Sequence, residues 1–281
     1  MEHLQVKKQS GDFASFSKER LIKSLLNSGA NKDDAEKVYN IIEKSLYNGI
    51  PTKDLYEKAF ATLKNIKSSI AAKYSLKRAL QKLGPDGFYF EKWVAKIFET
   101  QGYQAITGQT LEGKSTVTHE VDVVATNKKD FLICECKFRN DIDAKISVTT
   151  PMYFLARFED LKDKKFSFFN DNFVATKGFL ITNAFFTSDS INFSNYYHIN
   201  LISWNYPENN SLKKITDDYA LYPITCLTCL PEENIKEILD KECILVSQLA
   251  QNPTVLNALN LDQNHKKEII KEALEIIGKN L

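Results

Sequence analysis

The sequence lacks the features that mark membrane-spanning and secreted proteins. In its 281 residues no apolar run approaches the roughly 20 residues that a membrane-spanning helix needs. The opening stretch MEHLQVKKQSGDF contains no apolar signal region. The five cysteines are an odd number with no secretory context, which favours reduced thiols. We therefore predict a cytoplasmic protein with no membrane partner.

Two further kinds of site are not expected, and the net charge gives no sign of an overall basic surface. Cys226 and Cys229 have C-x-x-C spacing, but no His or Cys cluster supplies the other ligands of a zinc site, so buried structural cysteines are expected. Within residues 1–84 no Gly-rich loop ends in Gly-Lys-Ser or Gly-Lys-Thr, and ATP hydrolysis by this part of the chain is therefore not expected. The formal net charge is +1, so any basic surface that binds nucleic acid must be local.

Helix and strand patterns divide the chain into three blocks, and we predict a multidomain α/β protein. Residues 1–84 carry mostly helical patterns after a short hairpin. Residues 87–223 alternate between strands and helices, which predicts an α/β/α domain around a mixed sheet. Residues 225–281 contain only short helical patterns, which predicts a small all-α domain.

Capping residues predict where the helices of the first block begin and end. Ser17, Asn31 and Thr52 stand at three starts, and Gly29 and Gly49 at the ends of the first two helices. The run SSIAAKYSLKRALQKLG predicts one further helix.

The stretch HEVDVVATNKKDFLICECKF predicts a β-hairpin that carries charges in its strands. Two runs of β-forming residues flank the polar break TNKKD, and a turn centred on its Lys-Lys pair sets Asp122 opposite Glu135. Side chains alternate along a strand, so Glu135 and Lys137 share a face. Two opposed carboxylates repel each other, whereas a divalent cation between them reverses the sign of that interaction.

The charged hairpin can be interpreted as a catalytic site or as a purely structural element. Mg²⁺ is typically held by one or two carboxylates together with waters and phosphate oxygens, and Lys137 beside it could orient a metal-bound water and stabilise charge on a phosphate. The hairpin would then hydrolyse a phosphodiester. In the structural reading, the hairpin is exposed and amphipathic and the Glu-Lys pair is incidental.

Residues 87–207 resemble the PD-(D/E)XK nuclease superfamily, and within it the Mrr-like restriction endonuclease domain. The helical run GFYFEKWVAKIFETQGY, then HEVDVVA, then CECKF follow the family's order. The resemblance implies that Asp122 and Glu135 bind Mg²⁺, with Mn²⁺ as an alternative, and that Lys137 is the catalytic lysine. Glu91 falls on a helix glutamate that lies near the metal in many members, or is a surface charge.

The same resemblance suggests further positions for polar residues around the site. His119 either lines the site or ends a strand. The family often has a polar residue after the Glu-x-Lys strand, and the candidates here are Thr149, Thr150, Tyr153 and Arg157.

The runs VKKQSGDFASFSKERLIKSL and AAKYSLKRAL resemble the ATP-cone, a small regulatory nucleotide-binding domain. A tight Gly turn that gathers backbone amides and basic side chains suits a triphosphate. The positions that carry the resemblance are Val6, Lys8, Gly11, Phe16, Arg20, Tyr74, Lys77 and Arg78. It implies ATP or dATP as a regulatory ligand, although Gln9 stands where the family usually has Arg. The alternative is a small helical dimerisation module.

The last block resembles helix-hairpin-helix-like domains, which place helix N-terminal amides against a DNA phosphate. Asn264, His265, Lys266 and Lys267 lie where that contact could form, but LNLDQN replaces the expected Gly-containing hairpin. Binding to DNA, binding to protein and a packing role all stay open.

Together these patterns predict a Mg²⁺-dependent DNA endonuclease that is regulated by ATP or dATP and serves in restriction or defence against foreign DNA. One site per chain favours at least a homodimer for double-strand cleavage. The alternative is a non-catalytic, nucleotide-responsive DNA-binding or regulatory protein in which the nuclease fold is a scaffold.

Overall fold

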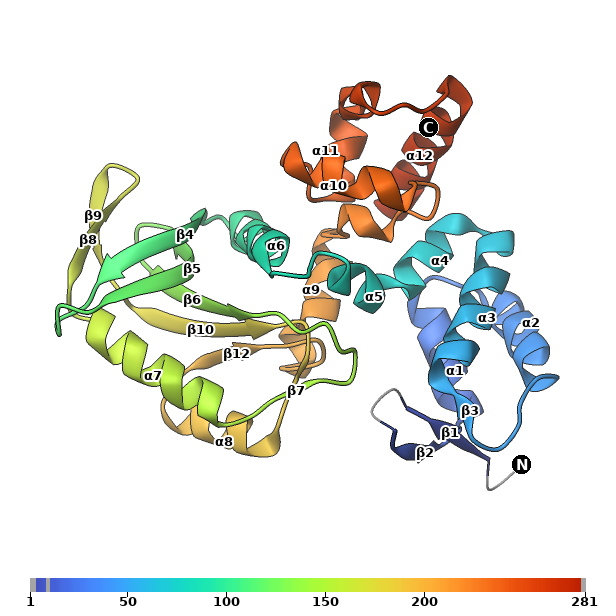
Figure 1. Ribbon diagram of the computed structural model, residues 1–281, viewed down its shortest axis with the longest axis horizontal. Helices are drawn as coiled ribbons and strands as arrows, with labels where there is room; N and C mark the ends of the chain where they lie inside the picture. Colours follow the sequence, from blue (N-terminus) through green and yellow to red (C-terminus); the bar gives the residue numbers. More distant parts are fainter. Residues whose placement is uncertain (1–3, 9–10, 279–281) are drawn as a thin grey trace. The chain divides into compact units, whose positions relative to one another are not determined.

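The computed structural model describes residues 4–8 and 11–278, which form two compact units (Figure 1). Unit 1 comprises the described residues up to Ala79 and from Tyr222 onward, and unit 2 comprises Leu80 to Leu221. Unit 2 is therefore inserted between two segments of unit 1. The predicted fold class is confirmed, because a helical N-terminal segment, a mixed sheet with helices and a helical C-terminal segment follow each other along the chain.

The N-terminal segment of unit 1 is a helical bundle beside a three-stranded sheet. In the sheet, β1 pairs antiparallel with β2 and parallel with β3. The elements are β1 (Gln5–Lys7), β2 (Phe13–Ser15), α1 (Lys18–Asn27), α2 (Lys32–Glu43), β3 (Ile50–Pro51), α3 (Thr52–Ile66) and α4 (Ser68–Tyr74). Apolar side chains from these helices and from β1 and β3 form one buried cluster that includes Leu25, Val38, Ile42 and Leu63.

Two of the predicted helix starts are confirmed, and two details are wrong. Ser17 and Asn31 are N-caps whose side chains accept backbone N–H groups of their first turns. Thr52 is the first residue of α3 and follows Pro51 at the cap position. Helix α2 ends at Glu43 instead of continuing to Gly49, because the chain turns back there so that β3 can pair with β1.

The run that predicts a single fourth helix forms two shorter helices. Helix α4 ends at Tyr74, and α5 (Leu76–Gln81) follows after Ser75. The Ser75 hydroxyl donates a hydrogen bond to the carbonyl of Ala72 at 2.8 Å, a local contact that competes with regular helix geometry.

The C-terminal segment of unit 1 packs against α4. It contains α10 (Glu232–Asp240), α11 (Val246–Gln251) and α12 (Gln263–Ile276), with 3₁₀ turns at Ile224–Cys226 and Pro253–Ala258. The Glu275 carboxylate on α12 accepts the Ser69 hydroxyl at 3.1 Å and lies 3.5 Å from the Lys67 ammonium. Because α4 has no side-chain cap of its own, Glu275 supplies the negative charge that favours a helix N-terminus.

Unit 2 is a five-stranded mixed sheet between helices (Figure 1). Its strand order is β12-β10-β6-β5-β4, in which β10 is parallel to β6 and β12, and β5 is antiparallel to β4 and β6. Helix α6 covers one face, and α7 and α8 cover the other. The bounds are α6 (Phe88–Thr100), β4 (Gln104–Glu112), β5 (Thr118–Thr126), β6 (Phe131–Lys137), α7 (Thr149–Leu161), β10 (Lys177–Thr182), α8 (Ser188–Tyr196) and β12 (Asn200–Ile202).

Shorter elements complete unit 2, and one hairpin among them was not anticipated from the sequence. They are β7 (Lys145–Ile146) paired with β11 (Phe185–Phe186), the hairpin of β8 (Lys165–Phe168) and β9 (Asp171–Val174), a 3₁₀ turn at Glu208–Asn210, and α9 (Leu212–Tyr219). The β8–β9 hairpin brings Phe166 and Phe173 onto Phe131 of β6, so it extends the core over the end of the sheet.

Strand β6 is buried on both faces. Phe131 and Ile133 lie in the core cluster shared with α7, and Cys134 and Cys136 are buried on the alternate positions. The cysteines are free thiols and four of the five are buried, as the structural interpretation predicts, while Cys229 is half-buried.

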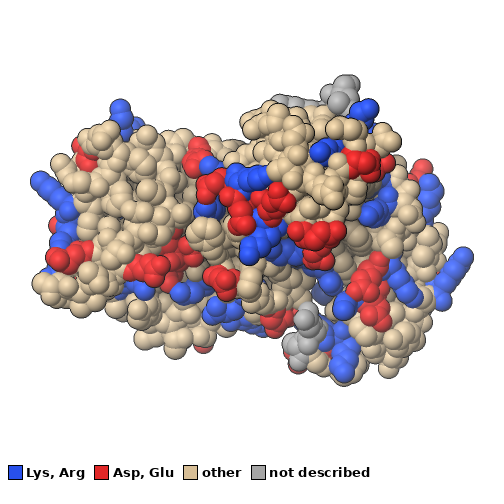
Figure 2. Space-filling model, turned by 45° about the horizontal axis from the view of Figure 1, so that its top comes forward, with Lys and Arg blue, Asp and Glu red and all other residues tan. Residues whose placement is uncertain are grey.

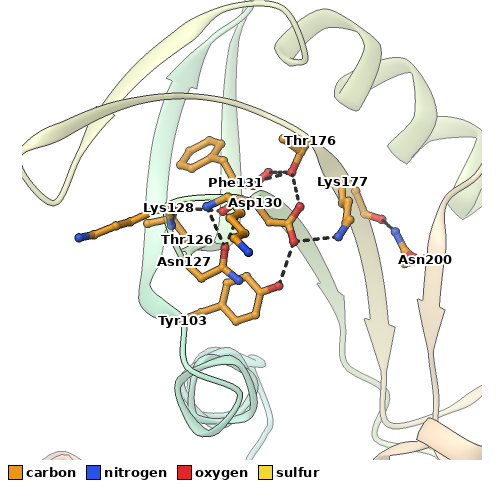
Figure 3. Close-up of polar contacts among 11 residues, drawn as sticks. Tyr103, Thr126, Asn127, Lys128, Asp130, Phe131, Thr176, Lys177 and Asn200 are labelled. Carbon is orange, nitrogen blue, oxygen red and sulfur yellow. Dashed lines mark hydrogen bonds and ion pairs between the residues drawn. The ribbon is translucent and has the colours of Figure 1, made fainter.

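A polar network closes the turn of the β5–β6 hairpin (Figure 3). The Asp130 carboxylate accepts the Lys177 ammonium at 2.8 Å and the Tyr103 hydroxyl at 3.3 Å. The Asn127 side chain accepts the backbone N–H of Asp130 at 2.9 Å. The hydrogen bond from Lys177 lowers the pKa of Asp130, so this carboxylate stabilises the folded hairpin when it is ionised.

The surface charge is mixed. Figure 2 shows basic and acidic side chains interspersed over the face in view, in keeping with the net charge of +1. Within residues 4–8 and 11–278, no helix is both long enough and apolar enough to cross a membrane.

Candidate nuclease site and nucleotide site

The β5–β6 register brings the predicted acidic residues to one place. Val123 pairs with Cys134 and Val124 with Ile133, and the same register sets Asp122 opposite Glu135, as the predicted turn requires. The Asp122 Oδ2 atom accepts the backbone N–H of Cys136 at 2.6 Å. This bond fixes the carboxylate at the end of the ladder beside Glu135.

Glu135 is a buried carboxylate with a cation on each oxygen. Its relative exposure is 4%, so the reading of an exposed amphipathic hairpin is wrong. The Lys137 ammonium contacts Oε1, and the Arg157 guanidinium contacts Oε2 through Nη1. A buried charge is tolerated only with such partners.

Arg157 reaches the site from α7. Its Nη1 also donates to the backbone carbonyl of Glu120 at 2.9 Å, and its Nη2 donates to the Tyr153 hydroxyl at 3.3 Å. The Nε atom is buried and has no hydrogen-bond partner among the described residues. The guanidinium is thus held by a strand carbonyl, a carboxylate and a phenol, while the N–H of Nε has no partner among the described residues.

Burial and neighbouring carboxylates raise the pKa of two carboxyl groups, Asp122 and Glu91. Burial, followed by the charge of Glu135, raises the pKa of Asp122 to about 6. Burial, followed by the charges of Asp122 and Glu120, raises the pKa of Glu91 to about 7. Glu91 lies in the first turn of α6, so the structure brings this residue into the field of the hairpin acids. A cation bound among them would relieve this repulsion.

The donor set is compatible with Mg²⁺. No group of three or more His, Cys, Asp or Glu side chains is arranged as a metal cage within the described part of the chain. Mg²⁺ does not need such a cage, because it keeps several waters and commonly binds one or two carboxylates plus substrate phosphate oxygens. Asp122 and Glu135 match that smaller requirement.

The other predicted polar residues have different surroundings. His119 Nε2 lies 2.8 Å from Asp160 of α7, which places this side chain in a contact between β5 and α7. The hydrogen bond from His119, followed by those from Ser115, lowers the pKa of Asp160 to about 2. Of the four candidates after the strand, Arg157 contacts Glu135 and Tyr153 contacts Arg157. Thr149 bonds to Ser147, and Thr150 is half-buried in the first turn of α7.

The N-terminal nucleotide-binding candidates lie on or beside the β1–β2 hairpin. Val6 is buried in β1, and Phe16 packs against the same cluster, whereas Lys8 and Arg20 are exposed. Gly11 has φ +91°, a conformation that glycine adopts without strain, and its N–H donates to the Lys8 carbonyl at 3.0 Å. Gln9 and Ser10 lie outside the described residues.

The other candidates form an aromatic stack with a residue that the sequence patterns did not single out. Tyr74 at the end of α4 stacks on Tyr56 of α3 with ring centroids 5.4 Å apart and an interplanar angle of 9°. The Arg78 guanidinium lies 3.8 Å from the centre of the Tyr56 ring, and Lys77 is half-buried in α5. The sequence did contain one indication of this stack. Tyr56 precedes Phe60 by four positions on the predicted helix, a spacing that brings side chains together, and the two rings do stack.

The predicted phosphate-binding helix end is capped by its own chain. The Asp262 carboxylate accepts the backbone N–H groups of Asn264 and His265 at 2.8 and 2.9 Å. His265 Nε2 lies 2.6 Å from the Cys229 carbonyl oxygen, while Lys266 is half-buried and Lys267 exposed. These two N-terminal amides of α12 are therefore occupied within unit 1.

Family models match three consecutive parts of the chain. Residues 4–83 match the ATP cone domain, residues 83–205 match a restriction endonuclease domain of the Mrr catalytic type, and residues 222–277 match the AF1548-like C-terminal domain. The protein therefore combines an ATP-cone domain, a nuclease-like domain and an AF1548-like C-terminal domain, and the predicted three-part architecture is confirmed.

Two relatives correspond to about two thirds of the chain. An uncharacterized protein of Archaeoglobus fulgidus is 27% identical over 186 residues, which are 66% of this chain and 100% of the relative. A crystal structure described as a protein of unknown function, AF1548, is 26% identical with a TM-score of 0.54, and covers 68% of this chain and 98% of its own. Their names assign no activity, so the chemistry must be argued from the residues.

Proposed function

We propose that this protein is a Mg²⁺-dependent DNA endonuclease that is regulated by ATP or dATP and acts in restriction or defence against foreign DNA. The observation that carries the proposal is the buried Glu135, flanked by Lys137 on its own strand and Asp122 across the hairpin, within a restriction endonuclease-like domain. The proposed domains are 1–84 for the nucleotide, 87–223 for the nuclease and 225–281 for the C-terminal helices. The proposed state is a cytoplasmic homo-oligomer.

Each side chain has a role that follows from its surroundings. Asp122 and Glu135 would hold the divalent ion, which supplies a Lewis acid and an activated water when bound. Lys137 has 32% side-chain exposure, so its ammonium can face both Glu135 and a substrate phosphate and stabilise the charge that develops there. Glu91 has a pKa of about 7 and can therefore accept or release a proton near neutral pH.

Cleavage of supercoiled plasmid tests the nuclease function. The wild-type protein is expected to nick or linearise the plasmid with Mg²⁺, and excess EDTA is expected to stop the reaction. Asp122→Ala removes one of the two carboxylates and is expected to lower the rate at least about a hundredfold, the scale of losing a group that stabilises transition-state charge. No cleavage by the wild type with or without ATP and dATP would contradict the proposal.

Nucleotide binding to the cone is tested separately. Arg78 covers the Tyr56 ring and is the cation nearest the aromatic stack, so Arg78→Ala is expected to weaken ATP or dATP binding about tenfold in calorimetric titration. Lys53→Ala is the matched control, because Lys53 lies on α3, is 71% exposed and pairs only loosely with Glu57 at 3.8 Å. Equal affinity for Arg78→Ala and wild type would remove Arg78 from the proposed nucleotide site.

One observation favours the non-catalytic alternative. Both oxygens of Glu135 are paired with cations of the chain itself, an arrangement that would also stabilise a nuclease fold used only as a scaffold. The two functions differ in a single measurement, because a scaffold protein would bind DNA without cleaving it under any metal or nucleotide condition.

A further inference from the structure

The pairing of Glu135 creates a competition for its oxygens. Oε1 contacts Lys137 and Oε2 contacts Arg157. Each oxygen keeps a second lone pair, but a divalent ion bound there lies beside one of these cations and is repelled by it, so withdrawal of one cation favours metal binding. Lys137 is two residues from Glu135 on the same strand. Arg157 comes from a different element and has its own second set of contacts at Glu120 and Tyr153.

One edge of the Arg157 guanidinium, formed by Nε and Nη2, makes few contacts. Nη1 donates to Glu135 and to the Glu120 carbonyl, whereas Nη2 makes a single long bond of 3.3 Å to the Tyr153 hydroxyl. Nε, which shares an edge with Nη2, is buried and has no partner among the described residues. A buried donor without a partner is unfavourable by about 1–3 kcal/mol. Two parallel N–H groups on one edge of arginine match the oxygens of a phosphate.

We propose that Arg157 holds Glu135 before metal binds, releases its oxygen to the divalent ion, and then contacts a DNA phosphate through its Nε–Nη2 edge. This inference rests on the proposed nuclease function. It gives Arg157 two successive partners of the same charge, first a carboxylate of the protein and then a phosphate of the substrate. The ion and the DNA therefore favour each other's binding. The ion displaces Arg157 from Glu135, which frees the guanidinium for a phosphate, and the phosphate keeps the guanidinium away from the oxygen that the ion ligates.

Metal binding without DNA tests the first half of the proposal. Mn²⁺ binding to the full-length protein is measured by electron paramagnetic resonance for wild type, Arg157→Met and Lys162→Met. Loss of the competing cation is expected to tighten Mn²⁺ binding about tenfold in Arg157→Met, the scale of one charged hydrogen bond. Lys162→Met is the matched control, because Lys162 immediately follows α7 and pairs with Glu159 in an exposed contact. It is expected to bind Mn²⁺ as the wild type does.

DNA binding tests the second half. Anisotropy of a labelled duplex is titrated in Ca²⁺, another ion that prefers oxygen ligands. Arg157→Met is expected to bind DNA about tenfold more weakly, with a salt slope smaller by about one. Arg157→Lys retains the charge but lacks the Nε–Nη2 edge. It is expected to bind Mn²⁺ like the wild type and DNA like Arg157→Met. Circular dichroism verifies that each variant is folded, and Arg157→Gln, which also removes the charge and the Nε–Nη2 edge, replaces Arg157→Met where the latter is not.

The outcomes separate this inference from the nuclease function. Wild type that cleaves DNA, together with Arg157→Met that binds Mn²⁺ no more tightly, overturns the competition and leaves the function intact. Wild type and Arg157→Met that both fail to bind Mn²⁺, together with wild type that does not cleave, overturn both. Tighter Mn²⁺ binding with weaker DNA binding in Arg157→Met supports the inference.

Discussion

Lys137→Met is expected to lower Mg²⁺-dependent cleavage by about a hundredfold to a thousandfold. The ammonium faces Glu135 Oε1 and is partly exposed, so it can act on a water or phosphate beside the metal. Methionine keeps the length of the side chain and removes the charge. Glu135 still has Arg157 as a partner, so the fold retains a counter-cation.

Single-turnover cleavage at saturating protein separates this effect from DNA binding. The control is Lys164→Met, since Lys164 lies in unit 2 and its ammonium pairs with Glu112 at 2.8 Å. The control is expected to cleave within about twofold of wild type, as is usual for a surface pair. A wild-type rate for Lys137→Met would show that the lysine has only a structural part in the hairpin.

Asp122→Asn is expected to raise the free energy of unfolding of unit 2 at pH 8 by about 1–3 kcal/mol. Burial and Glu135 raise the pKa of Asp122 to about 6, above its ordinary value of 3.8. The folded protein therefore binds this proton more tightly than the unfolded chain does. The stabilisation that the protonated group provides is complete below pH 4 and is lost as the pH rises to about 6. Asparagine stays neutral and can still accept the Cys136 N–H, so it avoids that loss.

Unfolding in guanidinium chloride, followed by tryptophan fluorescence, measures the change in the free energy of unfolding of unit 2. Both tryptophans of the chain, Trp93 and Trp204, lie in that unit. The control is Asp130→Asn, at the other end of the same hairpin, because its effect on the free energy of unfolding is expected to have the opposite sign. Lys177 lowers the pKa of Asp130, so its contribution is present at neutral pH and is lost as the pH falls through the lowered value. Asp130→Asn is expected to destabilise at pH 7. Destabilisation by Asp122→Asn at pH 8 would contradict the repulsion among the site acids.

The hairpin could be predicted because the residues that determine it are close together in the sequence. Two β-forming runs and a short polar break define the turn, and the period of two then decides that Asp122 and Glu135 face each other. The N-caps Ser17 and Asn31 were readable for the same reason, since a capping side chain bonds within its own first turn.

The partners of these residues were not predictable, because they come from distant parts of the chain. Arg157 was one of four candidates, and only the packing of α7 against the sheet decides that it meets Glu135, 22 residues earlier. The Tyr56–Tyr74 stack depends on the packing of α3 against α4. The early end of α2 reflects pairing of β3 with β1, a contact between strands that are far apart in sequence.

The insertion of unit 2 into unit 1 has a consequence for the order of folding. The hydrogen bond between Ser69 and Glu275 joins residues 206 positions apart, with all of unit 2 in the intervening loop. Closing a flexible loop of that length costs on the order of 5 kcal/mol of chain entropy. A folded unit 2 replaces most of that loop by a rigid body and removes much of the cost. We therefore expect the nuclease-like domain to fold first, and α12 to dock onto α4 afterwards.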